Sequence, residues 1–418
     1  MRETKTGQLK RDLRLIDAIG IGLGAIIGAG IFVVTGVAAG VAGPSFLVGL
    51  FLAGVVATFN ALSSAQLAAT YPQSGGTYEY GYQVLNPWLG FAAGWVFLAS
   101  KLAAAGTVAL GFAGYFTALF PVAPERIVAI SAAFLLTLVN YFGIRKSGYL
   151  NIVIVSVSVS ALIYFIGAGI PSFNSENLTP FAPQGWGGAI ESTALLFFAY
   201  TGYARLATLG EEVHAPKKTI PKAILWALGI AIILYTGVAL VAVAGVGAEA
   251  LAASRSPLEA AARSFRLPGV VLMVVIGATT AMLGVLLSQL LGISRMIFAM
   301  SRKGDLPAVF DHVHSKHGVP DRGIILAGFF AILVALFGTF ETIVAAAAFT
   351  ILLYYSIANL AAMKMREEDK LFPNWIPVAG FISCLLLAST LPLDVIATGL
   401  GLLAAGFIWR VIYRRWIS

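Results

Sequence analysis

The residues best placed to do chemistry are small ones inside an apolar segment, in the run Ile26-Ile27-Gly28-Ala29-Gly30-Ile31-Phe32. Glycine in a helix interior costs about 1 kcal/mol relative to alanine, so this run is a weak point of a helix. In a bilayer, a broken helix exposes backbone N–H and C=O groups, which is costly unless they line a cavity or meet a ligand. The run therefore predicts a helix that opens at the middle of a membrane, as in secondary transporters.

A second interrupted segment, Phe197-Phe198-Ala199-Tyr200-Thr201-Gly202-Tyr203, lies five apolar segments later. An odd number of crossings turns the second copy upside down, which indicates inverted repeats around a shared site. The spacing of Gly20, Gly24 and Gly28 is also typical of tightly packed membrane helices. Both interpretations stay open: packing for the first two glycines, and opening from Gly28 to Gly30. A dinucleotide loop is excluded because no strand precedes the run.

Both glycine-containing runs lie inside long apolar segments. The 418 residues are 59% hydrophobic and 11% charged, which leaves too little polar surface for a soluble protein. About 20 apolar residues cross a bilayer, and we expect crossings at 16–41, 45–70, 88–119, 126–143, 149–170, 188–209, 220–246, 269–300, 323–339, 341–362, 376–391 and 394–413. The prediction is an all-α integral membrane protein with about 12 transmembrane helices, forming one domain over residues 1–418.

The distribution of basic residues predicts the orientation. With alternating sides, twenty lysines and arginines share the side of both termini, and four (Arg126, Arg255, Arg263 and Arg266) fall on the other. The positive-inside rule then places both termini in the cytoplasm of a multi-pass cell-membrane protein. The net charge of +8 is thus an orientation signal rather than a nucleic-acid patch. The single cysteine, Cys384, excludes an intrachain disulfide, and we expect no cofactor.

Four motifs resemble those of the amino acid–polyamine–organocation transporters, which share the fold of the bacterial leucine transporter. They are Leu9-Lys10-Arg11-Asp12-Leu13 leading into the first glycine run, Tyr71-Pro72-Gln73-Ser74-Gly75-Gly76-Thr77-Tyr78 with Asn86-Pro87-Trp88, Phe198 to Tyr203 with Glu211-Glu212, and Ser301-Arg302-Lys303-Gly304-Asp305-Leu306-Pro307. The resemblance implies a 5+5 inverted repeat, with repeat one about 16–170, repeat two about 188–362, broken helices 1 and 6, and two appended helices about 376–413. It also implies a secondary active transporter or exchanger of amino acids that works by alternating access, and no enzyme.

The same resemblance implies that broken backbone holds the groups common to all amino acids. Amides at the positive end of the half-helix after the break suit a carboxylate, and the carbonyls left behind suit an ammonium. The predicted substrate-binding residues are Ile26, Ile27, Gly28, Ala29, Gly30, Ile31, Phe198, Ala199, Tyr200, Thr201 and Gly202. Phe198 is expected to cover the ligand, although its neighbour Phe197 could take that part.

The expected coupling site departs from the family pattern. Proton-coupled relatives carry a lysine on helix five, where this chain has Ser158. Helix eight offers Thr279 and Thr280, a turn before the usual hydroxyl position, rather than a clear sodium site. Neither an equivalent of that lysine nor a clear sodium site is therefore evident, and a proton is retained as the expected partner ion, with sodium less favoured.

Lys101 and Arg205 fall inside expected crossings, where a charge costs roughly 3 kcal/mol or more and indicates function. Lys101 lies near the middle of the third crossing. It is predicted to couple protons or to receive an anionic group of the substrate, unless it pairs with carbonyls or snorkels to the surface. Arg205 is a further coupling candidate, but it lies closer to a helix end and is expected to pair with Glu211, Glu212 or a backbone terminus.

Other functions fit the sequence less well. A polyamine or other organocation carrier of the same fold would need acidic residues around its pocket, and a channel would need a filter-like loop. An intramembrane enzyme would need paired acids or a nucleophile with a base. The histidines at 312, 314 and 317 have spacing that could bind zinc, but a solvated loop is the favoured explanation.

Overall fold

The computed structural model describes residues 13–71, 75–143, 148–207 and 213–417. Within these ranges the chain is helical, and strand-type pairing is limited to one isolated bridge between Leu13 and Val213. The α-helices are α1 Leu15–Ile26, α2 Thr35–Ala42, α3 Phe46–Thr70, α4 Thr77–Tyr80, α5 Pro87–Leu119, α6 Glu125–Tyr141, α7 Gly148–Gly169, α8 Gly185–Tyr200, α9 Ala204–Ala207, α10 Pro216–Val246, α11 Ala248–Ala252, α12 Pro257–Arg263, α13 Val270–Arg302, α14 Asp321–Phe337, α15 Phe340–Met363, α16 Trp375–Ser389 and α17 Leu393–Ile417.

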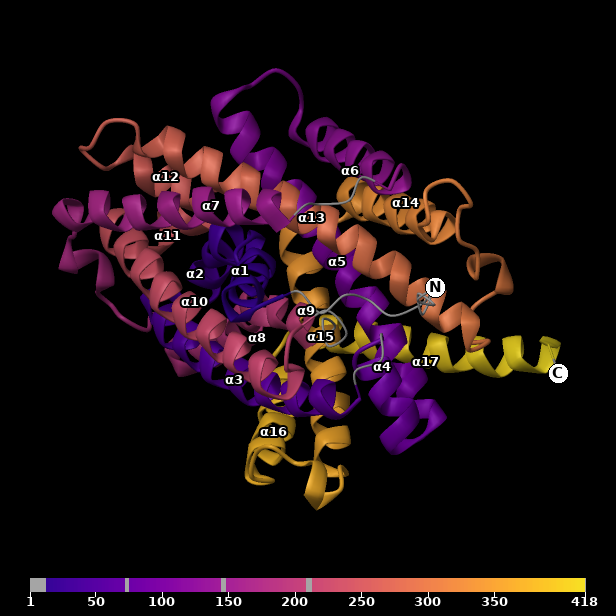
Figure 1. Ribbon diagram of the computed structural model, residues 1–418. Coiled ribbons are helices and arrows are strands. Elements are labelled where there is room, and N and C mark those ends of the chain that lie inside the picture. The colour runs from indigo at the N-terminus through magenta and orange to yellow at the C-terminus, as the bar shows by residue number, and fades with distance from the viewer. Residues whose placement is uncertain (1–12, 72–74, 144–147, 208–212, 418) are drawn as a thin grey trace.

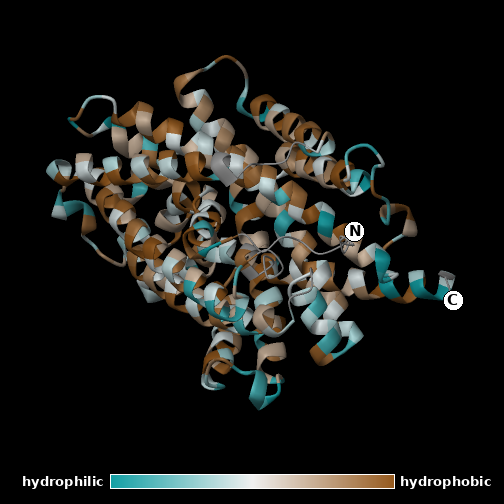
Figure 2. Ribbon diagram, in the orientation of Figure 1, coloured by the Kyte–Doolittle hydropathy of each residue, from teal (hydrophilic) through white to brown (hydrophobic). Residues whose placement is uncertain are grey.

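Apolar length identifies a multi-pass membrane protein. Among the described residues, seven stretches are long and apolar enough to cross a bilayer: Leu15–Thr70, Pro87–Leu119, Asn151–Ser172, Pro216–Val246, Val270–Arg302, Phe340–Met363 and Leu393–Trp416. The helix Trp375–Ser389 is apolar but shorter. Hydrophobic residues run along the helices, and hydrophilic ones gather at the loops and the far end of α17 (Figure 2). The all-α membrane architecture is confirmed, whereas twelve crossings and the inverted repeat remain predictions.

The first helix breaks at the glycine run. α1 ends at Ile26, and Ile27 has extended backbone angles of φ −74° and ψ 108°. The chain then continues through a π-helical turn, Gly30–Val34, into α2. Helical hydrogen bonding stops at Ile27, whose amide donates to the Leu23 carbonyl at 2.8 Å. The break falls inside the run that the sequence singles out.

The sixth expected crossing is interrupted differently. α8 ends at Tyr200, a 3-10 turn covers Thr201–Tyr203, and α9 follows from Ala204. The Thr201 hydroxyl donates to the Phe198 carbonyl at 3.0 Å, which satisfies one carbonyl of the ending helix. This segment therefore narrows into a tighter helix and contains no extended residue.

Two glycines let the interrupted segments touch. A Cβ atom on Gly30 would lie 2.4 Å from the Ala199 Cα, and one on Gly202 would lie 2.1 Å from the Ala25 carbonyl oxygen. Both distances are far below van der Waals contact, so only glycine fits at these positions. The close approach brings the two weak points together, with α7, α10 and α13 also packed against α1 (Figure 1).

The later helices surround this pair. α5 packs against α13 and α15, while α16 packs against α3 and α15, and α17 runs along the outside against α15 and α5 (Figure 1). α5 begins at a well-formed cap, because the Asn86 side chain accepts from the amides of Trp88 and Leu89 at 3.0 Å and Pro87 occupies the first turn. One end of the bundle is referred to below as the terminal face. It is formed by the segments 77–86, 303–320 and 364–374 together with the end of α17.

Candidate functional site

An internal cavity lies where the two interrupted segments meet. It is lined by α1 and the break that follows it, by α8 and its 3-10 turn, and by α5 and α13. The lining residues are Ala25, Ile26, Gly28, Ala29, Gly30, Lys101, Val108, Phe198, Ala199, Thr201, Gly202, Val285 and Gln289. The centre of a water molecule can move through about 30 Å³ of it. That is room for about two waters, so an amino acid would have to widen it.

The structure brings most of the predicted binding residues to this cavity. Ile27, Ile31 and Tyr200 are the predicted residues that do not line it. The Tyr200 hydroxyl instead points to α3, where it donates to the Leu50 carbonyl at 3.3 Å. Phe198 lines the cavity, whereas Phe197 is fully buried with its ring 5.6 Å from that of Tyr355. Of the two phenylalanines, Phe198 is thus the one placed to cover a ligand.

At both interruptions a tyrosine hydroxyl donates a hydrogen bond to a backbone carbonyl. Tyr235 of α10 donates to the Ile26 carbonyl at 2.9 Å, and Tyr355 of α15 donates to the Thr201 carbonyl at 3.3 Å. A carbonyl oxygen has two lone pairs, so each can still accept from a second donor. The sequence interpretation missed both tyrosines. A buried tyrosine hydroxyl requires a partner, and that need is the signal that could have pointed to them.

Two polar groups of the lining have no partner among the described residues. Lys101 of α5 makes no hydrogen bond or ion pair with those residues, and its ammonium lies 5.8 Å from the centre of the Phe97 ring in a cation–π contact. The Gln289 Oε1 atom of α13 is buried and accepts no hydrogen bond from the residues described. Gln289 was missed from the sequence because a single amide in an apolar helix gives no periodic signal.

Three of the other predicted coupling residues, Ser158, Thr279 and Thr280, do not line the cavity. The Ser158 hydroxyl donates to the Ile154 carbonyl at 2.8 Å and to the Gly277 carbonyl at 3.3 Å, so it joins α7 to α13. Thr279 donates to the Val275 carbonyl in its own helix at 2.7 Å, and neither it nor Thr280 lines the cavity. Arg205 belongs to α9, and its expected partners Glu211 and Glu212 lie outside the described residues.

The histidine loop forms local contacts. His312 Nδ1 lies 2.7 Å from Asp321 Oδ1, and His314 Nδ1 accepts from the amides of Lys316 and His317. Burial raises the pKa of Asp321, but the contact with His312 and the amide of Arg322 outweigh it, so that pKa lies below its usual value. Among the residues the structure describes, no group of three or more metal-binding side chains occurs. The zinc interpretation therefore gains no support.

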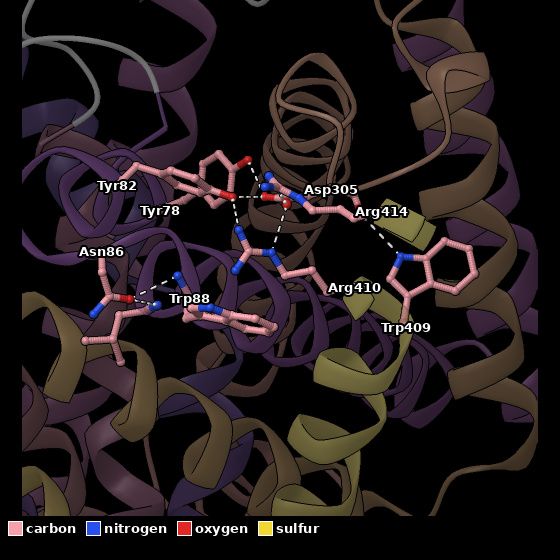
Figure 3. A network of polar contacts seen from close by, with 9 residues as sticks. Tyr78, Tyr82, Asn86, Trp88, Asp305, Trp409, Arg410 and Arg414 are labelled. Atoms are coloured by element: carbon pink, nitrogen blue, oxygen red, sulfur yellow. Dashed lines mark hydrogen bonds and ion pairs between the residues drawn. The ribbon is translucent and has the colours of Figure 1, made fainter. Parts of the chain in front are cut away.

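A separate polar network closes the terminal face around Asp305 (Figure 3). This carboxylate is fully buried and accepts from the Tyr78 and Tyr82 hydroxyls at 2.9 and 2.5 Å. Arg410 and Arg414 of α17 approach it at 3.3 and 3.2 Å. Burial and the nearby carboxylate raise the pKa of both tyrosines, which keeps their hydroxyls protonated as donors.

An all-helical membrane bundle with two interrupted helices facing one internal cavity defines a membrane transport protein. The chain also matches the family model described as amino acid permease over residues 17–412, and it belongs to that family. It is 40% identical to an uncharacterized transporter of Mycobacterium tuberculosis over 98% of this chain and 93% of that protein. It is 29% identical to the branched-chain amino acid permease BcaP of Bacillus subtilis, over 97% and 94%. A methylthioribose transporter of Bacillus subtilis is 32% identical over 93% and 90%. The family and these relatives are transporters, not enzymes.

Proposed function

We propose that the protein is a secondary active transporter or exchanger of amino acids that works by alternating access. The observation that carries this proposal is the meeting of the α1 break and the α8 interruption at one cavity. The substrate carboxylate would bind the amides of Gly28, Ala29 and Gly30, at the positive end of the half-helix that follows. The substrate ammonium would bind carbonyls near Ile26 and Thr201.

Loop contacts support the proposed topology of twelve crossings with both termini in the cytoplasm. Segments expected on one side touch one another: Leu13 pairs with Val213, and the end of α17 meets Asp305. On the other expected side, Arg255 and Glu125 form an ion pair at 2.6 Å. With the basic residues on the side of the termini, the positive-inside rule makes the terminal face cytoplasmic in a cell membrane. One domain with repeats at about 16–170 and 188–362 fits these contacts.

A proton is the coupling ion that we propose. Ser158 and Thr279 direct their hydroxyls to helix carbonyls, and neither residue lines the cavity. Lys101 is the titratable side chain that lines the cavity. A lysine can gain and lose a proton when it is buried, so it is the candidate for proton transfer.

The residues that line the cavity also argue against the alternative of a polyamine or organocation carrier. The lining contains Lys101 and no carboxylate, so a dication would meet a like charge there instead of a partner. The substrates in the names of the relatives, a branched-chain amino acid and methylthioribose, show that the family does not fix the substrate.

Countertransport in liposomes tests the proposal. Purified protein is reconstituted, the vesicles are loaded with an unlabelled amino acid, and uptake of the labelled compound is followed at two pH values with and without sodium. We expect saturable uptake that is faster in loaded vesicles, depends on pH and does not change when sodium is added. Flux that does not saturate and gains nothing from loading would identify a channel, and no flux or binding for any amino acid would refute the substrate assignment.

A further inference from the structure

The unpaired lysine of the cavity requires an anion that the protein does not supply. Among the described residues, no carboxylate forms an ion pair with Lys101, and the residues lining the cavity with it are apolar, small or neutral. A charge at this depth is costly unless it is paired. The cation–π contact to Phe97, with the ring centre at 5.8 Å, offsets only part of that cost.

Snorkelling does not remove this cost. Lys101 lies within α5, Pro87–Leu119, about 21 Å along the helix from its start and about 27 Å from its end at 1.5 Å per residue. The hydrocarbon core is about 30 Å thick, so an α5 centred in it leaves Lys101 roughly 10 Å from the nearer edge, which is farther than the four-carbon stem reaches. The ammonium therefore remains near the cavity.

The second unpaired group of the cavity is of the opposite kind. Gln289 Oε1 is an acceptor without a donor, while the Lys101 ammonium is a donor without an acceptor. A ligand that satisfies both must bring an anionic group and a donor such as an ammonium. A neutral amino acid brings one carboxylate, which the proposed function already assigns to the broken backbone, and so leaves Lys101 unpaired.

We propose that Lys101 binds a carboxylate in the side chain of the substrate, so that the transported compounds are acidic amino acids. This inference rests on the proposed function and names its substrate class. The substrate ammonium supplies the donor that Gln289 lacks. Cationic amino acids are disfavoured because they would place a second positive charge beside Lys101.

The first test needs no variant. Glutamate and glutamine have nearly the same shape but differ in charge. The ratio of their apparent affinities for the reconstituted protein therefore measures the effect of the side-chain charge. We expect glutamate to bind at least tenfold more tightly than glutamine, and leucine and arginine to bind more weakly than glutamate. Succinate, which carries two carboxylates and no ammonium, is expected to compete poorly. A preference for glutamine, leucine or arginine over glutamate would overturn the inference.

The second test assigns the preference to Lys101. In Lys101→Met, affinity for glutamate should fall at least tenfold, while affinity for leucine should change less than threefold. Lys101→Arg should keep the preference for glutamate, and Lys364→Met, at an exposed lysine of the terminal face, should behave as the parent protein. An equal loss for glutamate and leucine in Lys101→Met would place the lysine at the shared carboxylate or in a structural role, which contradicts the proposal.

The two hypotheses fail in different ways. If no amino acid is bound or exchanged by the parent protein, the proposed function is wrong. If amino acids are exchanged but glutamate has no advantage over glutamine, the transporter assignment stands and the role of Lys101 is refuted. The elution and thermal transition of Lys101→Met in detergent show whether it folds. If it does not fold, Lys101→Gln replaces it, and the ratio of glutamate to glutamine affinity in the parent protein still tests the inference.

Discussion

The hydroxyl of Tyr235 has a role that depends on whether the cavity is filled. It donates to the Ile26 carbonyl at 2.9 Å, directly before the break at Ile27. If that carbonyl also accepts from the substrate ammonium, the hydroxyl and the ligand share one oxygen. The hydroxyl would then stabilise the break while the site waits for substrate.

Tyr235→Phe tests this sharing. Loss of the donor leaves a buried carbonyl unsatisfied, which costs about 1 to 3 kcal/mol, so the ligand-free variant should unfold at a lower temperature. Because a bound ammonium replaces the missing donor, saturating amino acid should raise the unfolding temperature more in Tyr235→Phe than in the parent protein. Thermal shift with and without ligand measures both effects. Equal ligand-induced shifts in the two proteins would show that the carbonyl takes no part in binding.

The interrupted helices depend on contact between their backbones, which is a property of the elements rather than of single side chains. Gly202 lies against the Ala25 carbonyl, and a Cβ atom there would be 2.1 Å from its oxygen. Neither backbone can yield without moving α1 away from the 3-10 turn. The geometry of the cavity is set by this contact.

Gly202→Ala should therefore abolish exchange and lower the unfolding temperature, since overpacking of this kind costs typically 1 to 3 kcal/mol. Gly292→Ala in α13 is the matched control, because its Cβ would meet nothing within 4 Å. That control should be neutral or more stable by up to about 1 kcal/mol, since alanine favours a helix interior. Exchange assays and thermal unfolding of both variants check the prediction, and an active Gly202→Ala protein would contradict it.

The sequence predicted the place of the break but not its form. Glycines in an apolar run reveal where a helix is weak, so the opening around Gly28 could be foreseen. The sixth segment was expected to open in the same way, but the Thr201 hydroxyl caps the Phe198 carbonyl and the chain tightens instead. That outcome depends on a side-chain rotamer, which residue spacing does not encode.

Residues from distant helices were harder to anticipate. Val285 and Gln289 of α13 line the cavity, and they lie four residues apart, so they share one helix face. Nothing in the composition of α13 distinguishes that face from its other apolar faces. Only the packing of α13 against α1 and α5 selects it. Lys101 was easier to find because a charge inside an apolar segment is conspicuous on its own.

At the scale of the whole molecule, Asp305 fastens the last helix to the bundle. Its carboxylate lies between the arginines of α17 and the tyrosines of the segment before α5 (Figure 3). The Trp409 indole also donates to the Asp305 backbone carbonyl at 3.1 Å. The motif from Ser301 to Pro307 thus positions a carboxylate that joins parts of the chain far apart in sequence.

Asp305→Asn should destabilise the protein by about 3 to 5 kcal/mol, because it leaves the buried Arg410 guanidinium without its anion. The control Asp311→Asn removes an exposed partner that lies 4.0 Å from Arg302 and should cost at most about 1 kcal/mol. Thermal unfolding in detergent compares the two. The double variant Asp305→Asn with Arg410→Met should recover part of the loss, and equal effects of the two single variants would show that the network is not a stabilising one.

Opposite the terminal face, one tyrosine hydroxyl joins three elements. Tyr115 of α5 donates to the Phe32 carbonyl at 2.5 Å, in the π-helical turn after the break, and accepts from the amide of Leu258 in α12 at 3.1 Å. We infer that these two bonds hold the cavity closed on that side. If the protein works by the proposed alternating access, they would have to break when the site opens there.

Tyr115→Phe should consequently shift the protein toward the state that is open opposite the terminal face. Each lost hydrogen bond contributes about 0.5 to 1.5 kcal/mol, so the population of that state should rise several-fold. The opening is measured with a cysteine introduced into the cavity lining, Val108→Cys, through its rate of labelling by a membrane-impermeant maleimide. The native Cys384 is fully buried and should not react.

The control Tyr164→Phe removes a hydroxyl that donates to the Pro268 carbonyl at 3.0 Å but keeps both hydrogen bonds of Tyr115. Its labelling rate should therefore equal that of the Val108→Cys parent. Faster labelling in Tyr115→Phe alone would identify the hydroxyl as part of the gate, whereas unchanged labelling would mean that the closed state does not depend on it.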